Sequence, residues 1–268
     1  MKLGIMQGRL FPNSVMKLQQ FPTNNWLDEI FAANNIGFNE FELLYDKKLD
    51  CLSVFRSEDS ITRLKRAKQD TGISTSSICV DYFANFNNMS KREEFLKLLY
   101  DIASIAKSFS IETIVIPYCD ENSINTVSEL ADVLNFFNLI DLDNFLESQN
   151  ITIAMEMNIK GELISNTFSK YTFKNIGICY DIGNASGNGY VAHKEIVLLQ
   201  NYIKHIHIKD KPLNGKNVML GEGIADFKEC INSLKRINYA KSCIFETGYF
   251  SSPIEEATQN YSYIKQFI

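Results

Sequence analysis

Short runs of apolar and β-branched residues recur along the chain and alternate with longer amphipathic stretches. The short runs have the length and composition of strands in a parallel sheet covered on both faces. Eight such runs are present, at residues 3–7, 38–44, 74–80, 112–117, 151–157, 175–181, 203–209 and 243–247. We therefore predict eight strands.

The amphipathic stretches predict helices between these strands. Asn24 or Asn25 is the expected N-cap of the first helix, and Gly72 is a stop signal at the end of the second. The predicted helices cover residues 24–35, 57–72, 90–109, 127–148, 161–170, 191–201, 225–237 and 253–266, of which 161–170 has the weakest pattern.

A strand followed by a helix, eight times over, predicts an α/β protein with parallel strands inside and helices outside. The 268 residues match a (β/α)8 TIM barrel, which has about 250. We predict a single barrel domain over residues 1–268. A doubly wound open sheet is the alternative, but no GxGxxG follows the first strand. Two ordinary domains would also fit the length, but no linker interrupts the series.

Composition narrows the class of partner. The formal net charge of −5 disfavours nucleic acid and favours a small molecule, with room for a local basic pocket that takes one phosphate. The six cysteines form no CxxC pair, which indicates reduced core thiols. We see no apolar leader and no apolar run of about 20 residues, so we expect a cytoplasmic protein without a membrane span.

Polar residues near the ends of the predicted strands are the candidate site, because β/α barrels carry their active sites at the C-terminal ends of the strands. In chain order they are Gln7, Glu42, Asp81, Tyr118, Glu156, Asp181, His207 and Glu246. The first four are candidate substrate-binding residues.

The last four, Glu156, Asp181, His207 and Glu246, come from four consecutive strands. Their side chains are ligand types for Mn²⁺, Mg²⁺, Co²⁺ or Zn²⁺. A carboxylate inside an apolar strand is costly unless it is paired or bound to metal. The alternative for each residue alone is a core carboxylate neutralised by Arg or Lys, but four at equivalent strand ends favour a metal site.

Residues 205, 207 and 209 alternate and so share one face of the seventh strand. His207 lies nearer the strand end and is the better ligand, and His205 is expected one layer deeper as a hydrogen-bonded core histidine. Lys209 either contacts a substrate oxygen or phosphate, or forms a salt bridge with Asp210 or Glu222.

Two loops carry further candidates. The glycine- and asparagine-rich run 181–190 predicts a loop suited to close approach of a ligand, with Asn184 as a polar contact or a turn residue. The run 220–227 predicts a loop that enters a helix capped by Asp226, with Glu222 as a candidate substrate contact. A phosphorylated substrate is favoured if Arg9 and Lys209 point into the pocket.

A family resemblance rests on an ordered set of motifs that spans essentially the whole chain. The motifs are MKLGIMQGRLFP, FPTNNW, GFNEFELLYD, YDIGNASGNGY, HIHIKD and GEGIADF. At these residues the chain resembles the xylose-isomerase-like TIM-barrel superfamily, and within it the sugar phosphate isomerase/epimerase proteins.

The resemblance implies one divalent metal bound by Glu, Asp, His and Glu of strands five to eight, which match Glu156, Asp181, His207 and Glu246 here. It further implies that Glu156 and Glu246 are the acid–base pair on opposite sides of a carbohydrate substrate. The implied activity is a metal-dependent isomerase that moves a proton next to a carbonyl through a metal-stabilised enediolate. A homodimer is compatible with such families.

Three other activities are alternatives to the isomerase that the resemblance implies. An inosose-dehydratase-like lyase would use the same ligands, and a non-catalytic sugar- or metal-binding barrel would need no acid–base pair. The DNA-repair endonucleases of the superfamily use a His-rich zinc cluster, which three histidines do not supply. Asn184 also departs from the pattern, since many members carry a substrate-contacting His there, and this leaves the substrate open.

Overall fold

The computed structural model describes residues 1–11, 20–22, 25–46, 51–86, 91–119 and 123–268. Eight parallel strands form a closed barrel in chain order, and β1 pairs with β8 to complete it. The predicted (β/α)8 fold is therefore confirmed, and each predicted strand is present within a few residues. The strands are β1 (Lys2–Met6), β2 (Glu40–Tyr45), β3 (Ser74–Val80), β4 (Thr113–Tyr118), β5 (Thr152–Met157), β6 (Ile176–Asp181), β7 (Ile203–Ile208) and β8 (Ser242–Phe245).

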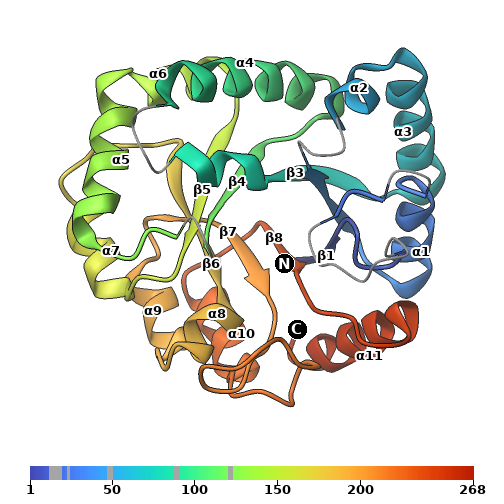
Figure 1. The fold of residues 1–268 in the computed structure, drawn as a ribbon. Helices are drawn as coiled ribbons and strands as arrows, with labels where there is room; N and C mark the ends of the chain where they lie inside the picture. The colour runs from blue at the N-terminus through green and yellow to red at the C-terminus, as the bar shows by residue number, and fades with distance from the viewer. Residues whose placement is uncertain (12–19, 23–24, 47–50, 87–90, 120–122) are drawn as a thin grey trace.

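The helices lie in a ring outside the strands (Figure 1). The helix α11 packs against α1, so the last and first helices are neighbours in this ring. The helices are α1 (Asp28–Ile36), α2 (Cys51–Arg56), α3 (Glu58–Thr71), the 3₁₀ helix η2 (Asp81–Phe86), α4 (Arg92–Phe109), α5 (Val127–Leu139), α6 (Leu142–Gln149), α7 (Gly161–Phe168), α8 (Ile182–Gly187), α9 (Ala192–Leu198), α10 (Phe227–Arg236) and α11 (Pro253–Lys265).

Helix ends follow local chemistry. The hydroxyl of Ser57 accepts a hydrogen bond from the amide of Ser60 at the start of α3, and Gly72 ends that helix with φ 72°, as predicted. Asp226 caps α10 by accepting from the amide of Glu229, also as predicted.

Several helix predictions are corrected. The predicted helix 127–148 is two helices, because Asp141 adopts φ 53° between α5 and α6. The run 181–190, predicted as a loop, contains α8. Helix α1 begins at Asp28, and Asn25 supports it through its backbone carbonyl rather than its side chain. Asn24, the other expected cap, lies outside the described residues. The short helix α2 was not predicted.

The barrel has an inner and an outer apolar core, because successive side chains on a strand point to opposite faces. The outer core joins strands to helices. The inner core is a small cluster of Met6, Leu44, Cys79, Val115, Ala154, Cys179 and Ile244. Ala154, Cys179 and Ile244 each precede a candidate site residue by two positions, so the inner core is the floor below Glu156, Asp181 and Glu246.

Five cysteines are described in full, and all are free thiols. Four are buried (Cys79, Cys179, Cys230 and Cys243) and Cys119 is partly buried, as expected for core thiols. Within the described ranges, none of the helices combines the length and the apolar character needed to cross a bilayer.

Candidate metal centre

Four side chains from four adjacent strands converge at one end of the barrel. Glu156 lies on β5, Asp181 ends β6, His207 lies on β7 and Glu246 follows β8. Each offers one ligand atom, and these atoms lie within 4.8 Å of one another. All four residues are buried, with at most 5% of their surface exposed. The structure thus brings together the four residues that the sequence singled out.

The distances suit a single ion. Nδ1 of His207 lies 3.1 Å from Oε2 of Glu246 and 3.4 Å from Oε2 of Glu156. Ligand atoms on opposite sides of one ion lie about 4.2 Å apart, since each bond is about 2.1 Å long. The spacing of the four ligand atoms is therefore compatible with a single ion.

Two of the ligand atoms make ion-pair contacts but no hydrogen bond with the described residues. Oδ2 of Asp181 and Nδ1 of His207 are buried and make no hydrogen bond with the described residues. Buried polar atoms are nearly always satisfied. Here Oδ2 of Asp181 faces the Lys209 ammonium and Nδ1 of His207 faces Glu246, and a bound metal would replace these contacts. Three carboxylates and one imidazole form an oxygen-rich set that fits Mn²⁺, Mg²⁺, Co²⁺ or Zn²⁺. The residues present therefore fit a divalent metal.

The ammonium group of Lys209 lies among the carboxylates of this cluster. Its Nζ atom is 2.8 Å from Oε2 of Glu246, 3.1 Å from Oδ2 of Asp181 and 3.6 Å from Oε1 of Glu156. Burial lowers the pKa of Lys209, but the three carboxylates outweigh burial and raise it well above its usual range. Lys209 therefore points into the site, and the alternative salt bridge to Asp210 or Glu222 is wrong.

Arg9 is a second cation at the cluster. It is 3% exposed, and its Nη2 atom lies 3.3 Å from Oε1 of Glu246. Burial raises the pKa of Glu246, but Lys209, His207 and Arg9 together hold that pKa well below its usual range. Glu246 is therefore ionised at neutral pH, as a metal ligand or a base must be.

Asn184 connects the cluster to a third cation. Its side-chain amide donates to Oε1 of Glu156 at 2.8 Å, and its carbonyl oxygen accepts from Nζ of Lys211 at 2.7 Å. Its backbone amide donates to Oδ1 of Asp181, which caps α8. The sequence did not single out Lys211, although the alternation of residues 205, 207 and 209 continues to 211 and could have indicated it.

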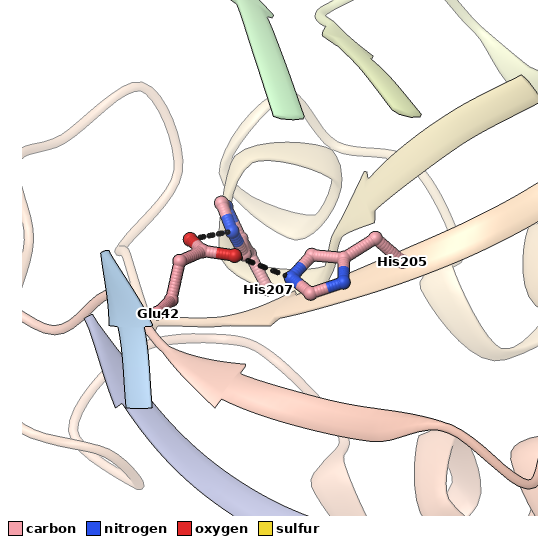
Figure 2. Close-up of side chains that lie close together, drawn as sticks. All are labelled: Glu42, His205 and His207. Atoms are coloured by element: carbon pink, nitrogen blue, oxygen red, sulfur yellow. Dashed lines mark hydrogen bonds and ion pairs between the residues drawn. The ribbon is translucent and has the colours of Figure 1, made fainter. Parts of the chain in front are cut away.

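Glu42 contacts both histidines of β7 (Figure 2). Its Oε1 atom is 2.9 Å from Nε2 of His207, and its Oε2 atom is 2.7 Å from Nε2 of His205. The second contact departs from ideal hydrogen-bond direction. Burial raises the pKa of Glu42, but His207 and His205 outweigh burial and lower the pKa below its usual range.

The remaining candidates lie in different environments. Gln7 is tied to the backbone, accepting from the amide of Leu44 and donating to the carbonyl of Trp26. Asp81 accepts a hydrogen bond from the thiol of Cys79, and burial, followed by the charge of Glu246, raises its pKa to about 7.

Two candidates at the rim and wall of the barrel differ in exposure. Tyr118, at the end of β4, is fully buried, and its hydroxyl makes no hydrogen bond with the described residues. Glu222 is exposed on the loop after β7 and is not part of the buried cluster, and its contact with substrate stays a prediction.

Asp210 organises this loop, beside the site. It is fully buried, and its carboxylate accepts hydrogen bonds from the backbone amides of Lys211, Gly221, Gly223 and Ala225. A Cβ atom on Gly223 would meet Oδ1 of Asp210 at 2.1 Å, so the loop needs glycine there to approach the carboxylate. This anchors the loop that follows Lys209 and Lys211.

The chain belongs to the xylose isomerase-like TIM barrel family, whose family model matches residues 30–267. This agrees with the resemblance drawn from the motifs. The match includes all four cluster residues, so the candidate centre lies within the part of the chain that defines the family.

The chain is also similar to individual proteins, one by sequence and two by fold. The chain is 27% identical over 238 residues to the L-ribulose-5-phosphate 3-epimerase UlaE of Escherichia coli O1:K1 / APEC, covering 82% of this chain and 81% of that relative. Among solved structures, D-psicose 3-epimerase from Clostridium cellulolyticum H10 has a TM-score of 0.73 at 14% identity, covering 100% of this chain and 99% of that one. The probable 3-DHS dehydratase AsbF from Bacillus anthracis has a TM-score of 0.77 at 15% identity, covering 99% of each chain.

Proposed function

We propose that this protein is a metal-dependent sugar epimerase that inverts a carbon next to the carbonyl of a ketose or ketose phosphate. The observation that carries the proposal is the pair Glu156 and Glu246, two carboxylates in one buried cluster with Asp181 and His207. The activities named for the UlaE relative and for the structurally similar D-psicose 3-epimerase support the choice of epimerisation.

Glu156, Asp181, His207 and Glu246 would hold one divalent metal, Mn²⁺, Mg²⁺, Co²⁺ or Zn²⁺. When bound, such a metal supplies Lewis-acid polarisation of a carbonyl oxygen and an adjacent hydroxyl. The protein's own part is to hold two carboxylates in a site where water is excluded. A carboxylate in such a site acts on a carbon acid more effectively than it does in water.

In the proposed reaction one of the two carboxylates, Glu156 or Glu246, takes the proton from the carbon next to the carbonyl. The other carboxylate returns a proton to the opposite face of the same carbon. No atom is gained or lost, and the product differs only in configuration. Return of the proton to the neighbouring carbon would give isomerisation, and loss of a hydroxyl would give dehydration.

The cations favour an anionic substrate. Arg9 and Lys209 contact Glu246, and Lys211 contacts Asn184. Their three positive charges balance the three carboxylates of the cluster, so a divalent metal would leave this end of the barrel positive. We therefore include ketose phosphates in the proposed substrate class, in line with the name of the UlaE relative.

The test is product analysis with metal-loaded protein. Chelated protein, reloaded with Mn²⁺, is incubated with L-ribulose 5-phosphate, L-ribulose, D-psicose and D-tagatose, and products are separated by chromatography and assigned by NMR. The proposal predicts an epimer from at least one ketose and none from the chelated protein. A product lighter by one water would establish a lyase instead, and metal binding without conversion of any sugar would establish a binding protein.

A further inference from the structure

The carboxylate of Glu42 has one oxygen against each histidine of β7. Figure 2 shows each ring joined to its own oxygen of the carboxylate by a separate contact. The ring centroids are 5.2 Å apart and the ring planes are nearly perpendicular. Glu42, His205 and His207 are at most 3% exposed, so water does not compete for these contacts.

This contact determines which nitrogen of His207 carries a proton. An ionised carboxylate only accepts hydrogen bonds, so the Nε2 atom of His207 must donate to Glu42. In the neutral imidazole that metal binding requires, the other nitrogen then offers its lone pair. That nitrogen, Nδ1, lies 3.1 Å from Glu246 and 3.4 Å from Glu156. The lone pair therefore points at the carboxylates of the cluster.

We infer that Glu42 is a positioning residue, which fixes His207 with its proton on Nε2 and its Nδ1 lone pair aimed into the metal cluster. The inference rests on the proposed metal site but not on the proposed reaction. It replaces the expectation that Glu42 binds substrate, since Glu42 is fully buried and contacts the side of His207 that faces away from the cluster.

His205 extends the same arrangement by one residue. Glu42 carries a charge inside the barrel, and its second oxygen faces Nε2 of His205 at 2.7 Å. Both side chains are buried, so this close contact holds the carboxylate through the oxygen that does not contact His207, although its direction departs from that of an ideal hydrogen bond. His205 thus orients Glu42, and Glu42 orients His207.

A second metal held by Glu42, His205 and His207 is the competing explanation, because their ligand atoms also lie within 4.8 Å of one another. A metal there would need Nε2 of both histidines without protons. The short direct contacts of both rings with the carboxylate favour protons on these nitrogens instead. The two explanations assign opposite protonation to Nε2 of His207, which makes them separable.

The first test uses the unaltered protein. Long-range ¹H–¹⁵N correlation spectra of ¹⁵N-histidine-labelled protein are recorded after loading with Cd²⁺, a diamagnetic probe for the site. The inference predicts that Nε2 of His207 carries a proton and that the Nδ1 resonance moves on loading. Metal bonded to Nε2, or no Cd²⁺ bound at His207, would overturn it. Neither readout depends on turnover, so failure to epimerise any sugar leaves this result standing.

The second test measures Mn²⁺ affinity by titration calorimetry. Hydrogen-bond partners of metal-binding histidines contribute about 10–100-fold to affinity. Glu42→Gln, which loses the negative charge, is expected to weaken Mn²⁺ binding about 10-fold, and Glu42→Met, which also loses the acceptor, about 100-fold.

Glu40→Gln is the matched control. Glu40 is a buried glutamate on the same strand and lies two residues before Glu42, but it pairs with Lys2 and Ser76 rather than with a histidine. Its change is expected to leave the Mn²⁺ affinity within about twofold, because it removes no partner of a metal ligand. Equal losses in the Gln variants of Glu40 and Glu42, or two Mn²⁺ ions per chain with one lost in Glu42→Gln, would overturn the inference.

Discussion

Nζ of Lys209 lies 2.8 Å from Oε2 of Glu246, in the middle of the four residues proposed to hold a metal. The ammonium also contacts Asp181 and Glu156, and so reduces the repulsion among three buried carboxylates. A metal bound at the cluster would take over part of this role. Lys209 and the metal are therefore coupled, and the coupling can be measured.

Lys209→Met should destabilise the metal-free protein strongly, because removing one partner of a buried ion pair costs about 3–5 kcal/mol. Added Mn²⁺ should recover much of this loss, since a ligand present at 100 times its Kd stabilises the folded state by about 2.7 kcal/mol. Thermal unfolding with and without Mn²⁺ measures both effects. Lys204→Met is the control, because Lys204 lies on β7, just before Lys209 in the chain, but is bonded to the carbonyl of Lys174. Equal stability of Lys209→Met and the original chain without metal would show that Lys209 does not neutralise the cluster.

Glu246→Gln should abolish epimerisation while the barrel stays folded, because general acid–base steps contribute about 10²–10⁴-fold to rate. The measurement is kcat at saturating Mn²⁺, with circular dichroism as the check on folding. Glu162→Gln, exposed on α7, is the control and should keep full turnover. Full activity of Glu246→Gln at saturating metal would remove Glu246 from the acid–base pair.

Asn184→Ala should lower kcat about 10–100-fold, because it removes a hydrogen bond to the charged Glu156, worth about 1.5–3 kcal/mol. Asn184 is not among the proposed ligands, so the Mn²⁺ affinity should fall much less than kcat. Steady-state kinetics and calorimetry on the same sample separate these two quantities. An unchanged kcat would show that Asn184 does not orient Glu156 for the reaction.

Asp210→Asn should destabilise the fold by about 3 kcal/mol, because hydrogen bonds to a charged group contribute about 1.5–3 kcal/mol each and its carboxylate accepts four from the backbone. Asp226→Ala removes only a helix cap and should cost about 1 kcal/mol. Denaturant unfolding compares the two variants. Similar losses in both would contradict the anchoring role of Asp210.

Glu29 should make stability depend on pH near neutrality. It is fully buried, and burial outweighs three backbone hydrogen bonds to raise its pKa to about 7. The folded state thus binds a proton more tightly than the unfolded state, whose glutamates titrate near pH 4.5. The stabilising contribution of protonated Glu29 is complete below about pH 4.5 and is lost as pH rises through about 7, a change of about 3 kcal/mol.

Denaturant unfolding between pH 4.5 and 8 measures this change for the original chain and for Glu29→Gln, which cannot titrate. Relative to Glu29→Gln, the original chain should lose unfolding free energy as pH rises. A difference that stays constant over this range would show that Glu29 has an ordinary pKa.

The barrel could be predicted because its strands are buried on both faces, and each therefore leaves a continuous apolar run. The same logic located Glu156 and Glu246, since a carboxylate in such a run needs a partner. Breaks set by single residues were harder to predict. Asp141 splits a continuous amphipathic pattern through its left-handed conformation, which the pattern does not encode.

The inner arrangement of the site was also beyond sequence alone. Glu42 lies within β2 and Asp181 ends β6, but strand position does not say which carboxylate contacts Nε2 of His207 and which belongs to the metal cluster. Residues 209 and 211 continue the alternation of β7, yet a lysine in such a place is as compatible with a surface ion pair as with the cluster. The packing of β2 against its neighbouring strands decides which carboxylate contacts His207 and which joins the metal cluster.

Exchange of hydrogen at carbon tests the central claim most directly. The Mn²⁺-loaded protein is incubated in D₂O with L-ribulose 5-phosphate and the other ketoses, and ¹H and ²H NMR follow the carbon next to the carbonyl. The account predicts deuterium at that carbon of the converted sugar, dependent on metal and lost in Glu246→Gln. A protein that binds Mn²⁺ at the cluster yet introduces no deuterium into any of these sugars would contradict it.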